Sequence, residues 1–168
     1  MLNLSTNILA YASDSAHTEQ MDDISSINAL RLLQAGDQFR ARLSSEFSAV
    51  HGLSVNEFFL LMHLDTATSN RLARVELAKR MHVSASTVTR MVAPMEKIGM
   101  VKRELDERDA RFAFVAITPA GQTRLKEAQA TFAKQSGYAF QDRWTKEELT
   151  NLSELLYRLV LGSSGNLS

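Results

Sequence analysis

Apolar residues recur at helical spacing over most of the chain, and this pattern predicts a largely α-helical protein. From Ile24 the apolar side chains follow one helix face as far as Val50, and His51-Gly52 is expected to end that helix. Gly36 lies inside the stretch, but one glycine costs only about 1 kcal/mol in a helix and need not end it. Residues 1–22 are rich in Ser, Asn, Asp and Thr without a sustained period, which predicts a flexible N-terminal extension.

Three further helices are predicted before residue 100. Ser54 to Glu57 has the form of a capping box and opens a helix that ends at the polar segment Thr66 to Asn70. Arg74 to Met81 is the next helix, and Ser84 is expected to be the N-cap of a helix that ends at Ile98-Gly99. Pro94 lies inside this last helix. Because proline removes an amide hydrogen bond and crowds a carbonyl, a kink or local loosening is expected there rather than a stop.

A β-hairpin is predicted after Gly99. Val101 to Leu105 alternates apolar and charged residues as a half-buried strand does, and Phe112 to Ile117 is rich in strand-forming residues. Thr118-Pro119 then reads as the N-cap and first residue of a helix that runs to about Phe140. A second capping box at Thr145 to Glu148 opens a last helix, which carries a continuous stripe of leucines.

The order of helix, turn, helix and hairpin between Val75 and Gly121 is that of a winged helix-turn-helix. In such a unit one helix supports a second helix, which enters a groove of DNA, and the hairpin contacts the DNA beside that groove. The predicted fold is therefore mainly α with a small β-hairpin wing, in which a winged helix-turn-helix is flanked by N- and C-terminal helices. Double-stranded DNA is the expected partner.

The composition narrows the class of protein. The chain of 168 residues has no cysteine, which excludes disulfides, thiolate metal sites and cysteine nucleophiles. The formal net charge is zero, but residues 1–70 carry −5, residues 71–111 carry +4 and residues 112–168 carry +1. A local positive face is enough to engage phosphates, although such charges also suit an ordinary solvated surface. No apolar run approaches the roughly 20 residues of a membrane span and no signal peptide is recognisable, so a cytoplasmic protein with no membrane partner is expected.

Three motifs resemble those of the MarR family of bacterial transcriptional regulators. They are Glu76-Leu77-Ala78, the helix start Ser86-Thr87-Val88-Thr89-Arg90, and the wing Asp106 to Arg111 followed by Ile117-Thr118-Pro119-Ala120-Gly121. The resemblance spans roughly residues 24–160. It implies a homodimer whose terminal helices intertwine, with a winged helix on each side. It also implies repression of nearby genes, relieved when a small molecule alters the spacing of the two recognition helices.

The resemblance suggests how the chain is divided. After the extension at residues 1–22, a single MarR-like domain is expected at 23–162, followed by a tail at 163–168. Within the domain the winged helix-turn-helix is placed at about 53–118, and the dimerisation helices at about 24–50 and 119–160. The apolar stripe of the last helix favours burial against another helix, either the chain's own first helix or a partner's. With the homodimer that the resemblance implies, the dimer contacts are assigned to Ile24, Ile27, Leu149, Leu152, Leu156 and Leu159.

The helix from Ser84 is expected to lie in the major groove, where base edges present distinguishable donors and acceptors. Arg90 is the best candidate for a guanine contact because its planar fork can bond O6 and N7 together. The hydroxyls near the helix start are expected to contact bases or phosphates, and capping or back-bonding within the helix is the alternative for each. The predicted DNA-binding residues of this helix are Ser84, Ser86, Thr87, Thr89 and Arg90.

The wing is expected to add contacts beside the major groove. Arg108 at its tip is free to enter the minor groove, and Lys102, Arg103 and Arg111 complete the predicted DNA-binding set. Carboxylates at a DNA surface are repelled by phosphates. Asp106 and Asp109 are therefore interpreted as residues that shape the loop and hold its arginines, with Asp106 paired to Arg111.

Other chemistry is weakly represented in the sequence. The four histidines are scattered without the paired spacing of a metal site, so neither a metal nor a cofactor is expected. No motif of an enzyme is present. The family resemblance implies a small aromatic or amphipathic acid as effector, at a site the sequence does not identify. A winged helix that binds protein instead of DNA, and a transcriptional activator instead of a repressor, remain as alternatives.

Overall fold

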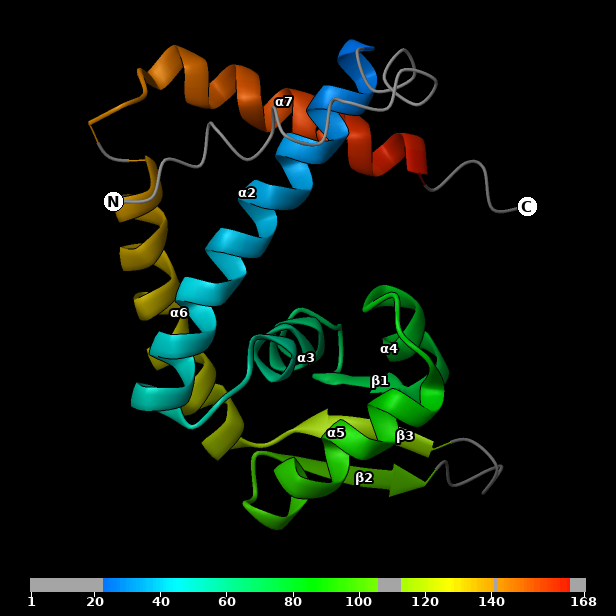
Figure 1. Cartoon of the computed structure of the whole chain (residues 1–168). Coiled ribbons are helices and arrows are strands. Elements are labelled where there is room, and N and C mark those ends of the chain that lie inside the picture. Colours follow the sequence, from blue (N-terminus) through cyan, green and yellow to red (C-terminus); the bar gives the residue numbers. More distant parts are fainter. Residues whose placement is uncertain (1–22, 106–112, 141, 164–168) are drawn as a thin grey trace, which may run out of the picture. The chain divides into compact units, whose positions relative to one another are not determined.

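The computed structural model describes residues 23–105, 113–140 and 142–163. Figure 1 traces the chain from α2 to α7. The described residues fall into two compact units, one up to Val55 and one from Asn56 onward. Within the described ranges, no helix combines the length and the apolar character that crossing a bilayer requires.

The first unit is one long helix with a distinct last turn. Helix α2 (Ile24–Glu46) runs without a break through Gly36 and continues into a π-helical turn, η1 (Phe47–His51). Gly52 ends it in the left-handed region, at a φ of 63° that glycine adopts without a Cβ penalty. The predicted helix and its end at His51-Gly52 are confirmed.

The second unit contains the winged helix-turn-helix. Its elements are α3 (Val55–Asp65, beginning at the last residue of the first unit), β1 (Arg71–Ala73), α4 (Arg74–Arg80), α5 (Ala85–Lys97), β2 (Val101–Leu105), β3 (Ala113–Ile117), α6 (Pro119–Phe140) and α7 (Lys146–Ser163). The strands form one antiparallel sheet in the order β1-β3-β2. Helix α4 contacts α5, β1 and β3, and α5 contacts β2 (Figure 1).

Strand β1 is the element that the sequence did not predict. It has only three residues, Arg71 to Ala73, which is too short to show the alternation that marks a strand. Its pairing with β3 joins Leu72 to Val115, far away in the chain, and buries both side chains. The two predicted strands are thus part of a three-stranded sheet. The third strand, β1, precedes the helix-turn-helix in the chain and pairs with β3.

The core of the second unit is built from the faces predicted to be apolar. Phe58 of α3 is fully buried, and its ring stacks on that of Phe132 of α6 with centroids 5.6 Å apart. Other buried apolar side chains come from each element between α3 and α6: Leu60, Leu61, Leu64, Leu72, Leu77, Val88, Val92, Met95, Val101, Val115 and Leu125. Helices α3, α4, α5 and α6 and the sheet thus all contribute apolar side chains to the interior of this unit. The apolar face of α5 is buried there.

Three predicted helix ends of this unit are confirmed, the starts of α6 and α7 and the end of α5. Thr118 caps α6, since its Oγ1 accepts a 3.1 Å hydrogen bond from the Gly121 amide. Thr145 and Glu148 form the reciprocal bonds of a capping box, at 3.2 Å from the Glu148 amide and 2.8 Å from the Thr145 amide. Gly99 follows α5 at a φ of 74°. Helix α5 continues through Pro94 to Lys97, so the proline does not stop it.

The start of α6 fits against the end of α5 only because residue 121 is glycine. A Cβ there would overlap the Met100 carbonyl oxygen and approach Ile117. Gly121→Ala is therefore expected to lower the free energy of unfolding by about 1–3 kcal/mol, as overpacking does. Urea denaturation at fixed protein concentration measures the change.

Gly137 supplies the matched control in the same helix, since a Cβ at that position meets nothing within 4 Å. Gly137→Ala should stabilise the protein by about 0.5–1 kcal/mol through helix propensity. Equal effects of the two substitutions would show that the α5–α6 contact is not tight.

Candidate nucleic-acid interface

Helix α5 presents one apolar and one polar face, which is what a recognition helix requires. Val88, Val92 and Met95 are buried against the core. Ser84, Ser86 and Arg90 are exposed, whereas Thr87 and Thr89 are half-buried. The predicted DNA-binding residues of this helix therefore lie away from its core face and within its first two turns, the part that can reach base edges.

A chain of hydroxyl groups organises the start of α5. Ser84 is the N-cap, and its Oγ accepts a 3.1 Å hydrogen bond from the Thr87 amide. The same Oγ lies 2.8 Å from the hydroxyls of both Ser86 and Thr87. Nη2 of Arg90 then donates to Thr87 Oγ1 over 3.4 Å, a long and weak bond. The side chain proposed to read a base thus lies against the capping network of its own helix.

Thr89 connects the two helices of the helix-turn-helix. Its Oγ1 donates a 3.0 Å hydrogen bond to the Ala85 carbonyl and accepts one of 3.3 Å from Nη1 of Arg74. The hydroxyl is thus engaged within the protein, in the back-bonded arrangement that was the alternative to a phosphate contact. Arg74, the first residue of α4, was not singled out from the sequence. Its place in the basic segment 71–111 was the available signal.

The cations of strand β2 are held by carboxylates. Lys102 Nζ lies 2.7 Å from one oxygen of Glu104, and Arg71 Nη1 lies 3.0 Å from the other. To reach it, Arg71 crosses the central strand with its guanidinium 4.9 Å above the ring of Phe114. Hydrogen bonds from Lys102 and then from Arg71 lower the pKa of Glu104 below its ordinary value, so this carboxylate stays ionised between its two partners.

Arg103 is tied to the recognition helix itself. Glu96 of α5 accepts a 3.2 Å hydrogen bond from the Arg103 amide with Oε1, and its Oε2 lies 3.3 Å from Nε of the same arginine. This double contact fixes the start of the wing to the last turns of α5. Glu96 and Glu104 were not predicted as site residues. The contact of Glu96 with Arg103 depends on the packing of α5 on β2, and that of Glu104 with Arg71 on strand register, neither of which the sequence shows. The predicted wing residues Asp106, Arg108, Asp109 and Arg111 lie outside the described residues.

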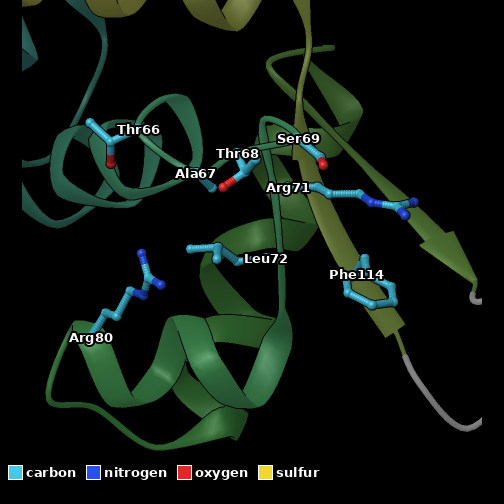
Figure 2. A pocket seen from close by; sticks show the side chains of 8 residues that line it. All are labelled: Thr66, Ala67, Thr68, Ser69, Arg71, Leu72, Arg80 and Phe114. Atoms are coloured by element: carbon cyan, nitrogen blue, oxygen red, sulfur yellow. The ribbon is translucent and has the colours of Figure 1, made fainter.

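A shallow hollow of about 370 Å³ lies beside the sheet. Figure 2 shows its lining, which comes from the turn after α3, from β1, and from Arg80 and Phe114. Both arginines that line it are already ion-paired, Arg71 with Glu104 and Arg80 with Glu76 at 2.9 Å. The hollow therefore offers no strong charge without the loss of an ion pair, and we assign it no ligand.

The histidines that the structure describes do not form a cluster with carboxylates. Among the described residues, no three His, Asp or Glu side chains lie close enough together to hold a metal ion. His63 is half-buried near the end of α3. Burial, followed by the nearby charges of Arg80 and His82, lowers the pKa of His63 below its ordinary value, so that the ring is favoured in its neutral form.

The predicted dimer residues are only partly covered within the chain. Ile24 is 62% exposed, and Leu156 and Leu159 are exposed, whereas Ile27, Leu149 and Leu152 are half-buried. The exposed apolar surface of α7 extends beyond the predicted stripe, because Leu155, Tyr157, Val160 and Leu161 are each more than half exposed. Three aromatic rings near the end of α6 and the start of α7 are exposed as well: Tyr138, Phe140 and Trp144.

Comparisons with known proteins agree on one family. A sequence model of the MarR family matches residues 53–112. The HTH-type transcriptional regulator PrsX of Escherichia coli is 30% identical over 111 residues, which cover 64% of this chain and 67% of PrsX. The HTH-type transcriptional repressor YetL of Bacillus subtilis is 35% identical over 81 residues, and this match spans about half of each chain, 48% in both cases.

The structural comparison supports the same fold. Sco3205, a MarR family transcriptional regulator from Streptomyces coelicolor solved in complex with DNA, superposes with a TM-score of 0.76 over 87% of this chain and 92% of Sco3205. The two sequences are 24% identical, and the likeness shows the fold alone. The predicted architecture, mainly helical with a winged helix-turn-helix, is confirmed.

The cap at Ser84 gives a prediction about the stability of the site. Ser84→Ala removes the acceptor for the Thr87 amide and should lower the free energy of unfolding by about 0.5–2 kcal/mol. Ser86→Ala is the control. The exposed Ser86 hydroxyl lies 2.8 Å from Ser84 Oγ, but without it the Thr87 amide keeps its acceptor on Ser84, so stability should change by no more than about 0.5 kcal/mol. Urea denaturation of both variants checks the difference. Similar values would mean that the helix start does not depend on the cap.

Proposed function

The chain belongs to the MarR family of DNA-binding transcription regulators, and from this premise we propose that it is a homodimeric repressor that a small effector releases from a pseudo-palindromic operator. The observation that carries the proposal is helix α5. Its buried face anchors it in the core, while its opposite face presents Ser86, Thr87 and Arg90 from the first two turns. As a regulator of transcription the protein would act in the cytoplasm.

The proposed division of labour follows from the contacts of each side chain. Arg90 reads a guanine through its two terminal nitrogens, a geometry that its weak bond to Thr87 does not oppose. Ser84, Ser86, Thr87 and Thr89 support the helix or contact phosphates. Lys102 and Arg103 meet the backbone beside the groove, where phosphates can replace the carboxylates that hold these cations in the free protein. Arg108 and Arg111 of the wing are proposed to extend these contacts to the minor groove.

A homodimer is supported by the exposed apolar surface of the terminal helices. A soluble monomer rarely leaves so many adjacent large apolar side chains in water, and association would remove them from it. Two copies related by a twofold axis would also place two recognition helices about one helical turn of DNA apart, ~34 Å, which matches a palindromic operator. An effector that changes this separation would lower affinity. A small aromatic or amphipathic acid is the proposed class.

The proposal is tested by fluorescence anisotropy on an operator selected from random duplex DNA, with a shuffled duplex for comparison, across a salt series. Tight, salt-sensitive binding that prefers the selected DNA is expected. Arg90→Ala should reduce the discrimination between the operator and a duplex with the contacted guanine replaced by about 1–3 kcal/mol.

Arg124→Ala is the matched control for Arg90→Ala. Arg124 lies on α6 and pairs with Glu127 at 3.5 Å on the surface, so its loss should leave base discrimination unchanged. Equal binding to operator and shuffled DNA by the wild type would overturn the proposed function. It would favour a winged helix that binds protein instead.

Leu156 tests the dimer separately from DNA. Leu156→Lys places a charge on the exposed apolar surface of α7 and should convert a dimer into a monomer in sedimentation equilibrium. Asn151→Lys adds the same charge to an exposed polar position of the same helix and should leave the dimer intact. A wild-type protein that sediments as a monomer would contradict the homodimer.

A further inference from the structure

The recognition helix and α6 are joined by hydrogen bonds that converge on one side chain. Thr118 Oγ1 donates to the Gly99 carbonyl at 2.6 Å and lies 3.1 Å from the Met100 carbonyl. The Thr118 amide donates to the Met100 carbonyl at 3.1 Å. Because a hydroxyl has one proton, the short bond to Gly99 is the principal one. The carbonyls held in this way belong to the two residues that immediately follow α5 and its C-cap at Ile98.

The same hydroxyl also begins α6. As N-cap, Thr118 Oγ1 accepts the Gly121 amide at 3.1 Å, so a single atom donates toward the end of α5 and accepts from the first turn of α6. Gly121 allows this approach, since any Cβ would strike the Met100 carbonyl. These contacts restrict hinge motion between the two helices, because they join the residues that follow α5 to the first turn of α6.

Two other contacts of α6 in this unit reach a different element. Gln122 Nε2 donates to Asp65 Oδ1 at 3.2 Å, and Phe132 stacks on Phe58, so both contacts join α6 to α3. They hold α6 on the core without touching the recognition helix. Thr118, together with the close packing of Gly121 on the Met100 carbonyl, links the start of α6 to the residues that follow α5.

We propose that Thr118 is a positioning residue for DNA recognition: by fastening α5 to α6 it fixes the separation of the two recognition helices in the dimer and thereby the operator spacing that the protein accepts. This inference rests on the homodimer proposed above, in which α6 belongs to the dimerisation region. Each recognition helix would lie ~17 Å from the twofold axis, half of the half-site separation. If the winged helix rotated by roughly 10° about that axis, its recognition helix would move by about 3 Å, close to the ~3.4 Å rise of one base pair. A small loosening of the junction is thus enough to change the spacing preference.

The test compares Thr118→Val with wild type on three duplexes that carry the selected operator, the operator with one base pair inserted between half-sites, and the operator with one removed. Wild type should discriminate against both altered spacings by about tenfold or more. Thr118→Val keeps the shape of the side chain and loses the hydroxyl, and should reduce that discrimination to about threefold or less. Discrimination against a changed base within a half-site should stay at its wild-type value, which mere destabilisation would not predict.

Two further variants control for folding and for residue type. Thr118→Ser retains the hydroxyl and should restore the wild-type spacing preference. Thr123→Val removes a threonine hydroxyl that bonds only within α6, to the Pro119 carbonyl at 3.1 Å, and should leave the preference unchanged. All variants are compared at a temperature where circular dichroism shows them folded.

The outcomes separate this inference from the proposed function. A folded Thr118→Val protein with wild-type spacing discrimination would overturn the inference and leave the proposed function standing. A wild type that binds its operator but tolerates every spacing equally would overturn both the inference and the twofold binding mode. Loss of base discrimination in Thr118→Val to the same extent as loss of spacing discrimination would also overturn it, because the residue would then act on the helix as a whole.

Discussion

The close approach of α6 to the Met100 carbonyl is the contact on which the placement of the recognition helix depends. Helix α5 has its apolar face in the core, but burial alone is non-directional and would allow the helix to slide or tilt. Hydrogen bonds are directional, and those of Thr118 fix the carbonyls just beyond the helix end. Glu96 fixes the same end to strand β2 through both the amide and the guanidinium of Arg103. The C-terminal end of α5 is therefore held from two sides, by α6 and by the sheet.

The N-terminal end of α5 is held by its own side chains and by α4. Ser84 caps the helix, and Arg74 bonds Thr89 across the turn. These bonds have a consequence for DNA binding, since hydroxyls and cations that are satisfied within the protein gain less from a phosphate than free ones would. Exposed ion pairs such as Lys102 with Glu104 contribute only about 0–1 kcal/mol, so exchange of a carboxylate for a phosphate costs little. Phosphate contacts of this kind would set the register of the helix on the duplex, and Arg90 is the residue proposed to supply the sequence preference.

The helices and their ends could be predicted from local sequence signals, whereas pairings between residues far apart in the chain could not. Capping residues act within four positions, so Ser84, Thr118 and Thr145 could be identified as helix starts, and Gly99 as the end of α5. Strand β1 could not be predicted, because its three residues are strand only through their pairing with β3. The pairing of Arg103 with Glu96 and that of Arg71 with Glu104 were missed for the same reason. A periodic pattern shows that Glu96 and Glu104 are polar, but strand register and the packing of α5 decide which cations they meet.

The contacts within one chain do not bury the apolar surface of the terminal helix, α7. Helix α7 has a capping box that defines its start, yet Leu155, Tyr157 and Val160 remain more than half exposed. A helix of 18 residues gains little from propensity alone, and most helical stability in proteins comes from the packing of an apolar face. In a homodimer that packing comes from the second copy, so the stability of α7 and the occupancy of the operator would both rise with protein concentration. Folding of the terminal region and DNA recognition would then be coupled through the same interface, and an effector that weakened the interface would act on both.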